Sequence, residues 1–232
     1  PTTLLSSAAS DVYKRQDLIL GNHGLNSRLR ATAEKPISMY VNDFDLNGSV
    51  EQIICAFNGD TSYPVIMKND LVRQIPALAG KYPSHASYSN QTIQDIFSSE
   101  ILDRSVILRA HILESCIIMN PGSGNATLEP LPAEAQFSPV YAIAAKDFNH
   151  DGSRDLLLGG NLSRAKPETG IYSASYGLYL EGMGRGTWKA VPADSSGFLV
   201  RGELRDMEIL EAGGKKMVAI ARNNDILHFY IF

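Results

Sequence analysis

Residues 147–155 read DFNHDGSRD and run directly into the apolar stretch LLLGG, residues 156–160. An earlier stretch, residues 43–51, reads DFDLNGSVE and runs into QIICAF, residues 52–57. Both segments fit one pattern, D-F-[DN]-x-[DN]-G-S-x-[DE], with oxygen-bearing side chains at positions 1, 3, 5 and 9 and glycine at position 6. Each is therefore an acidic loop that leads into a short buried strand.

The pattern is typical of a calcium-binding loop. Calcium takes six to eight oxygen ligands, whereas magnesium is less favoured because it demands octahedral geometry and keeps its waters. Glycine at position 6 allows a bend with positive φ, the carbonyl at position 7 offers a backbone oxygen, and the carboxylate at position 9 closes the shell. The predicted ligands are Asp43, Asp45, Asn47, Ser49 and Glu51 in the first loop and Asp147, Asn149, Asp151, Ser153 and Asp155 in the second.

An EF-hand is excluded by the residues on the C-terminal side of each loop. An EF-hand needs a carboxylate at position 12 and a helix on each side, but position 12 is Ile54 in the first loop and Leu158 in the second, and both loops run into strands. The alternative is a pair of Asx-rich turns that bind no ion. The matching register of the two loops, including phenylalanine at position 2 and serine at position 7, favours calcium.

The unit repeats a third time in part. Residues 17–21, DLILG, match residues 155–159, DLLLG, so Asp17 takes position 9 of a loop whose earlier residues are missing. Repetition of this kind indicates a repeat architecture.

Residues 6–16, SSAASDVYKRQ, match a translated transposase sequencing adaptor. We therefore interpret residues 1–16 as non-native read-through, with a native Ser/Ala-rich linker as the alternative. We expect the natural sequence to start at Asp17, in the middle of a longer protein.

The remaining sequence predicts an all-β architecture with one helical segment. Within residues 69–104, Leu71, Ile75 and Leu78 and then Ile93 and Ile96 follow helical spacing, which predicts two short helices, the second capped by Ser89 or Asn90. Short apolar runs separated by Gly, Asp and Asn turns predict antiparallel strands. The predicted strands are residues 17–22, 38–41, 52–57, 63–67, 105–113, 116–119, 140–145, 155–158, 177–180, 188–191, 207–210, 217–221 and 226–231.

Composition narrows the possible partners. The 232 residues carry 21 Lys and Arg against 25 Asp and Glu, so the formal net charge is −4 and nothing predicts nucleic-acid binding. No apolar run reaches the ~20 residues that a membrane-spanning helix needs, so no membrane insertion is expected. The two cysteines, Cys55 and Cys116, are expected as buried free thiols, with a disulfide between them as the alternative in an oxidising compartment.

The repeat resembles the FG-GAP/VCBS family, the calcium-loop repeats of integrin α-like β-propellers. More narrowly, the chain is similar to the C-terminal part of bacterial VCBS-repeat proteins of the ASPIC/UnbV type, through residues 17–28, 131–161 and 223–229. The resemblance implies a partial β-propeller of four-stranded blades over residues 17–232, with the segment at about 69–104 as a helical insertion. It also implies an extracytoplasmic location, secreted, periplasmic or on the cell surface, and further blades in the full-length chain.

Two functions are compatible with these features. The first, favoured here, is a non-catalytic, calcium-stabilised module for adhesion or for recognition of a protein or glycan. The second is a calcium-dependent polysaccharide-active enzyme of the propeller lyase type, in which the ion would neutralise a uronate carboxylate beside a basic residue. The sequence offers no convergent acid and base residues, so no catalytic or cofactor-binding residue is predicted apart from the calcium ligands.

Overall fold

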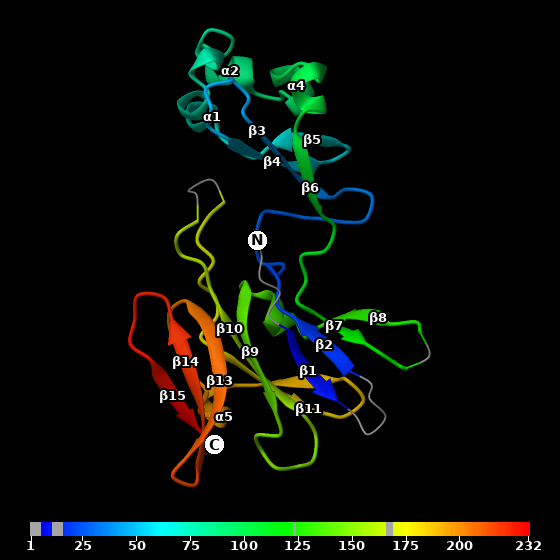
Figure 1. Cartoon of the computed structure of the whole chain (residues 1–232), viewed down its shortest axis with the longest axis vertical. Coiled ribbons are helices and arrows are strands. Elements are labelled where there is room, and N and C mark those ends of the chain that lie inside the picture. Colours follow the sequence, from blue (N-terminus) through cyan, green and yellow to red (C-terminus); the bar gives the residue numbers. More distant parts are fainter. Residues whose placement is uncertain (1–5, 11–15, 123, 166–168) are drawn as a thin grey trace. The chain divides into compact units, whose positions relative to one another are not determined.

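The computed structural model describes residues 6–10, 16–122, 124–165 and 169–232, and its chain forms two compact units. The first unit contains Pro1–Ser27, Glu114–Ala165 and Ile171–Phe232, and the second contains Arg28–Leu113 and Lys166–Gly170. Strands account for 38% of the structure and helices for 15%, and the strands form four small antiparallel sheets (Figure 1). The mainly β architecture that the sequence predicts is confirmed at this level.

The first unit contains three of the sheets. Their strand orders are β1-β2-β7-β8, β12-β11-β10-β9 and β13-β14-β15. The strands are β1 (Ser6–Ser10), β2 (Gln16–Leu20), β7 (Cys116–Met119), β8 (Thr127–Pro130), β9 (Val140–Lys146), β10 (Asp155–Gly160), β11 (Leu178–Gly182), β12 (Trp188–Val191), β13 (Leu204–Ala212), β14 (Lys215–Arg222) and β15 (His228–Ile231). Two short helical turns, η2 (Ala133–Gln136) and α5 (Ala193–Ser196), complete the unit.

Strand β10 is packed between two hydrophobic cores. Leu156 and Leu158 belong to a cluster that includes Ile19 of β2, while Leu157 belongs to a second cluster that includes Leu204 of β13. Successive side chains of a strand point to opposite faces, so the sheet that contains β10 is covered on both sides. This double burial explains why β10 reads as a continuous apolar run, and all six of its residues are buried.

The second unit combines one sheet with the helical segment. The sheet has the order β5-β4-β3-β6, with β3 (Ile37–Asn42), β4 (Glu51–Asn58), β5 (Thr61–Pro64) and β6 (Val106–Ala110). The helices are α1 (Lys68–Gln74), η1 (Pro76–Ala79), α2 (His85–Tyr88), α3 (Ile93–Ile96) and α4 (Ser99–Asp103). They share a core with the sheet, in which Ile53 and Cys55 of β4 pack with Leu71, Ile75 and Phe97.

The helical segment is confirmed, but it contains more than the two predicted helices, and the cap predicted for the second helix at Ser89 or Asn90 is wrong. Pro76 stands at the start of η1, where its missing N–H ends the α1 hydrogen-bond ladder. Asn90 has a φ of 63°, so it lacks the extended backbone that an N-cap needs. Thr92 caps α3 instead, in a capping box in which Asp95 accepts a hydrogen bond from the Thr92 backbone N–H at 2.8 Å.

Two strands were not predicted. Strand β1 pairs antiparallel with β2, so part of the segment interpreted as adaptor sequence lies in a sheet, and the interpretation of residues 1–16 stays a prediction. Strand β8 is exposed at all four positions, which leaves no apolar periodicity to detect. Among the helices of the described residues, none is both long and apolar enough to span a membrane.

Candidate metal centres

The two predicted loops occupy equivalent places in two sheets. The first loop joins β3 to β4, and Asn42 pairs with Glu51 across the hairpin. The second joins β9 to β10, and Lys146 pairs with Asp155. In both hairpins the residue at position 9 is therefore the first residue of the second strand, and residues 43–50 or 147–154 form the connection.

The aspartate at position 1 organises each loop through the backbone. Asp43 accepts hydrogen bonds from the backbone N–H groups of Asn47 at 3.0 Å and Gly48 at 2.8 Å. In the second loop Asp147 accepts the equivalent bonds from residues 151 and 152, at 3.1 and 3.0 Å. The side chain at position 5 then accepts a hydrogen bond from the N–H at position 7, at 2.7 Å in both loops. The common sequence pattern thus produces a common hydrogen-bond pattern.

Two positions of each loop have left-handed backbone. Gly48 has a φ of 88° and Gly152 a φ of 89°, which confirms the bend predicted for position 6. Position 4 is also left-handed, with φ of 59° at Leu46 and 62° at His150. This was not predicted, because leucine rarely adopts that region, although histidine is enriched there.

The phenylalanine at position 2 fixes each loop to its own hydrophobic core. Phe44 is 4% exposed and packs against Phe97 of the helical segment at 4.4 Å between ring centroids. Phe148 is 8% exposed and contacts Phe232 at 4.7 Å in an edge-on arrangement. The backbone N–H of each phenylalanine also donates to the carboxylate at position 9, so the side chain and the main chain both fix this residue.

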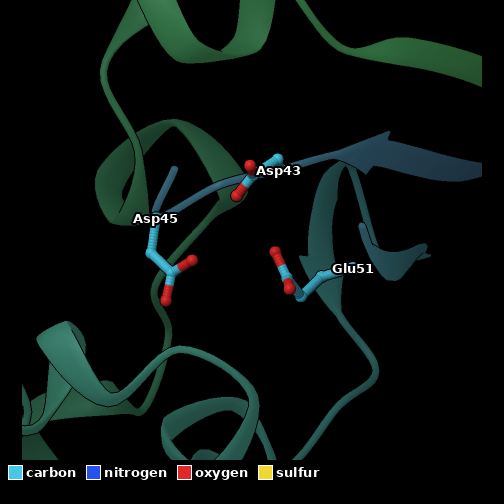
Figure 2. Close-up of side chains that lie close together, drawn as sticks. All are labelled: Asp43, Asp45 and Glu51. Atoms are coloured by element: carbon cyan, nitrogen blue, oxygen red, sulfur yellow. The ribbon is translucent and has the colours of Figure 1, made fainter. Parts of the chain in front are cut away.

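Three carboxylates converge in the first loop. Asp43, Asp45 and Glu51 each place an oxygen within 4.8 Å of the others, and they point toward a common space (Figure 2). Oxygens bound to one calcium ion at 2.3–2.6 Å are at most about 5 Å apart, so this spacing fits one ion. Asn47 and Ser49, the other predicted ligands, are exposed on the same loop.

One oxygen of this group has no protein partner. Oδ1 of Asp45 is buried and receives no hydrogen bond, and Glu51 is only 7% exposed. A buried carboxylate oxygen without a partner is unfavourable, and a cation at the centre of the three side chains would satisfy it. The residues present therefore fit calcium on an observation independent of the sequence pattern.

The second loop differs at position 9. Asp155 is completely buried, and its Oδ2 accepts hydrogen bonds from the backbone N–H of Phe148 at 2.9 Å and the hydroxyl of Tyr179 at 2.8 Å. Its Oδ1 accepts from the backbone N–H of Gly182 at 2.8 Å. Protein donors thus satisfy both oxygens, and in the described part of the chain only the first loop gathers three carboxylate, His or Cys side chains this closely.

The other predicted ligands of the second loop lie around its exposed rim. The amide of Asn149 donates to Asp151 at 2.9 Å and to Glu181 at 3.3 Å. The hydrogen bond from the Ser153 backbone, followed by that from Asn149, lowers the pKa of Asp151. Burial, followed by the hydrogen bond to Asp155, raises the pKa of Tyr179, so the phenol stays protonated and donates.

Asp17 reproduces one contact of Asp155. Its Oδ1 accepts a hydrogen bond from the backbone N–H of Asn120 at 2.8 Å, directly after β7, the partner of β2. Asp155 is bound in the same way by Gly182 of β11, the partner of β10. The repeat found in the sequence is therefore matched by a repeated contact at position 9.

Sequence reasoning missed Tyr179 and Glu181, which reach the second loop from β11. No sequence signal points to them, because the burial of Asp155, which requires hydrogen-bond donors, becomes visible only in the folded chain. Cys55 and Cys116 are both free and buried, as expected, and burial raises the pKa of their thiols to about 12 and about 11.

Comparisons with known proteins leave the family assignment as a prediction. No protein-family model matches the chain, and no curated protein is significantly similar to it.

Proposed function

We propose that this chain is a calcium-binding, non-catalytic recognition module. The observation that carries the calcium assignment is the buried, unpartnered Oδ1 of Asp45 beside Asp43 and Glu51. The ion would supply the missing partner and neutralise the three carboxylates, whose mutual repulsion otherwise opposes folding of the hairpin. Because only the folded loop gathers these ligands, calcium would stabilise the protein by mass action.

In this proposal the second loop also binds calcium, but it depends on the ion less than the first loop does. Its ligands would be Asp147, Asn149, Asp151 and the carbonyl of Ser153, with Asp155 held mainly by protein donors. Since those donors already order the loop, we expect the second loop to depend less on the ion than the first.

The finer architecture is part of the same proposal. Three of the four sheets have four strands, and the sheet containing β10 packs face to face between two others. These features support four-stranded blades of a β-propeller, completed by further blades of a longer chain. The resemblance to FG-GAP/VCBS repeats supports an extracytoplasmic location and a protein or glycan as the partner.

The catalytic alternative lacks the corresponding support. A polysaccharide-active enzyme would need an acid and a base within reach of one substrate position, next to an ion with an open coordination site. In the first loop the three carboxylates face one another, so protein oxygens would hold an ion placed between them, which favours a structural ion.

Calcium titration of the chelator-treated protein by isothermal calorimetry tests the proposal. We expect saturable heat with a dissociation constant below about 1 mM, the upper limit for extracellular calcium modules. Magnesium at the same concentrations serves as the control and is expected to bind more weakly. Absence of calcium-dependent heat from a folded sample would refute the metal assignment.

A further inference from the structure

A cavity of about 300 Å³ lies in the first unit, beside the second loop. It opens between the end of that loop and the glycine-rich turn that joins β11 to β12, and β2, β7 and β10 contribute its inner wall. Ligand sites begin at about this volume, which suits one six-membered ring. The proposed calcium ion would not occupy this space, although the second loop supplies Gly152, Ser153 and Arg154 to its wall.

One side of the cavity is apolar and rigid. Ile19, Ile117 and Leu156 line it, and each of them is at most 3% exposed. The half-buried indole of Trp188 continues this wall, and its Nε1 donates to the backbone carbonyl of Arg154 at 2.9 Å. An indole fixed along one edge offers its face to a ring without losing further side-chain entropy.

The other side carries two guanidinium groups. Arg154 and Arg185 both line the cavity, are exposed, and form no ion pair with any residue that the structure describes. Arg185 stands on a tight turn in which the Met183 N–H donates to the Thr187 carbonyl at 2.9 Å. Guanidinium groups bind carboxylates bidentately, so the rim is suited to an anion.

Hydroxyl groups and one carboxylate add polar contacts. Ser153 and Thr187 line the cavity, and the Thr187 hydroxyl donates to the Gly184 carbonyl at 2.8 Å, which leaves its oxygen free to accept. Asp17 also lines it, with Oδ1 occupied by the N–H of Asn120. The cavity therefore combines an apolar wall, a cationic rim and acceptors for hydroxyl groups.

We propose that this cavity binds a monosaccharide acid of the hexuronate class. The carboxylate would pair with Arg154 and Arg185, the C–H face of the ring would lie on Trp188, and Ser153 and Thr187 would bond to ring hydroxyls. The inference deepens the proposed recognition function, on which it rests, by naming a ligand class. It does not require calcium, because Trp188 and the turn hold one side of the rim through protein contacts, and hydrogen bonds to Asp147 and Asp155 hold the loop that carries Ser153 and Arg154.

The chain contains a single tryptophan, so its fluorescence reports directly on this cavity. We expect D-glucuronate to change Trp188 emission saturably in chelator-containing buffer, with at least tenfold tighter binding than glucose, which lacks the charge. Acetate, which lacks the ring, should bind no better than glucose. Equal affinity for the three compounds, or no saturable response, would overturn the proposal. Tighter binding of glucose 6-phosphate than of D-glucuronate would also overturn the hexuronate assignment and indicate a site for phosphorylated sugars.

Variants separate the cavity from general charge effects. Arg154→Gln and Arg185→Gln should each weaken glucuronate binding about tenfold with an unchanged melting temperature. Lys189→Gln is the matched control, because Lys189 neighbours Trp188 on β12 but does not line the cavity, and it should bind as the wild type does. An equal loss in Lys189→Gln would contradict the assigned site. Since calcium is absent throughout, failure here leaves the calcium result unaffected, and the reverse also holds.

Discussion

The Tyr179 hydroxyl donates a hydrogen bond to Oδ2 of Asp155, position 9 of the second loop, at 2.8 Å. At position 9 of the first loop, Glu51 instead faces two other carboxylates. The two loops share their sequence pattern and their backbone hydrogen bonds, yet they differ in the groups that complete them. In the first loop acidic oxygens face one another, and in the second a phenol and two backbone N–H groups complete the shell of the buried carboxylate. This difference predicts unequal dependence on calcium.

Asp45→Asn tests the first loop. We expect the variant to lose most of the calcium-induced rise in melting temperature, because a neutral amide is a weaker calcium ligand than a carboxylate. In chelator it should be at least as stable as the wild type, since one of three mutually repelling charges is removed. Differential scanning fluorimetry with calcium and with chelator measures both effects.

Asp60→Asn is the matched control for that experiment. The side chain of Asp60 is 96% exposed and pairs with Lys35 outside the loop, so the calcium response should be that of the wild type. A full calcium response in Asp45→Asn would remove the metal assignment from this loop.

Tyr179→Phe tests the second loop. Removing the hydroxyl leaves a completely buried carboxylate with one donor fewer, which should cost about 1–2 kcal/mol of unfolding free energy. The loss should be the same in calcium and in chelator, as measured by urea denaturation. Tyr63→Phe is the control, because the Tyr63 hydroxyl has no hydrogen-bond partner among the residues described. A loss confined to calcium-free conditions would contradict the role assigned to Asp155.

Gly48→Ala tests the bend at position 6. With φ at 88°, an alanine there should destabilise the protein by about 1 kcal/mol even though no atom lies within 4 Å of the added Cβ. Gly80→Ala is the matched control, since Gly80 has equally open surroundings but a φ of −68°. It should be neutral or stabilise by up to about 1 kcal/mol. Chemical denaturation of both variants decides the point, and equal effects would argue against strain in the loop.

The lowered pKa of Glu203 predicts that the protein loses stability in acid. The hydrogen bonds from Ser163 and Asn223 lower the pKa of this carboxyl from 4.5 to about 2, and Arg205 adds an ion pair at 2.6 Å. Because the folded-state pKa lies below the unfolded value, the stabilisation is complete above about pH 4.5 and is lost as the pH falls toward 2. Glu203→Gln should therefore cost about 2 kcal/mol at pH 7 and progressively less below pH 4.5. A difference that stays constant from pH 6 to pH 2.5 would contradict this assignment.

Local patterns predicted the features that depend on neighbouring residues. The loop bends at Gly48 and Gly152, the hairpins that surround them and the helical segment all follow from short-range spacing. The capping box of Thr92 and Asp95 was also visible in the sequence as a T-x-x-D pattern and was overlooked. The contact between Tyr179 and Asp155 spans 24 residues, so only tertiary structure reveals it. The propeller architecture, the location and the partner remain predictions, because none of them follows from the local geometry.

The contact between the rings of Phe44 and Phe97 connects the first loop with the helical segment, and the Asn42 side chain adds a hydrogen bond to the carbonyl of Ile101 at 3.0 Å. Loosening of the hairpin therefore removes packing from beneath the helices. The rate of proteolytic cleavage between residues 68 and 103 would then report whether an ion is bound in the first loop, which lies earlier in the chain.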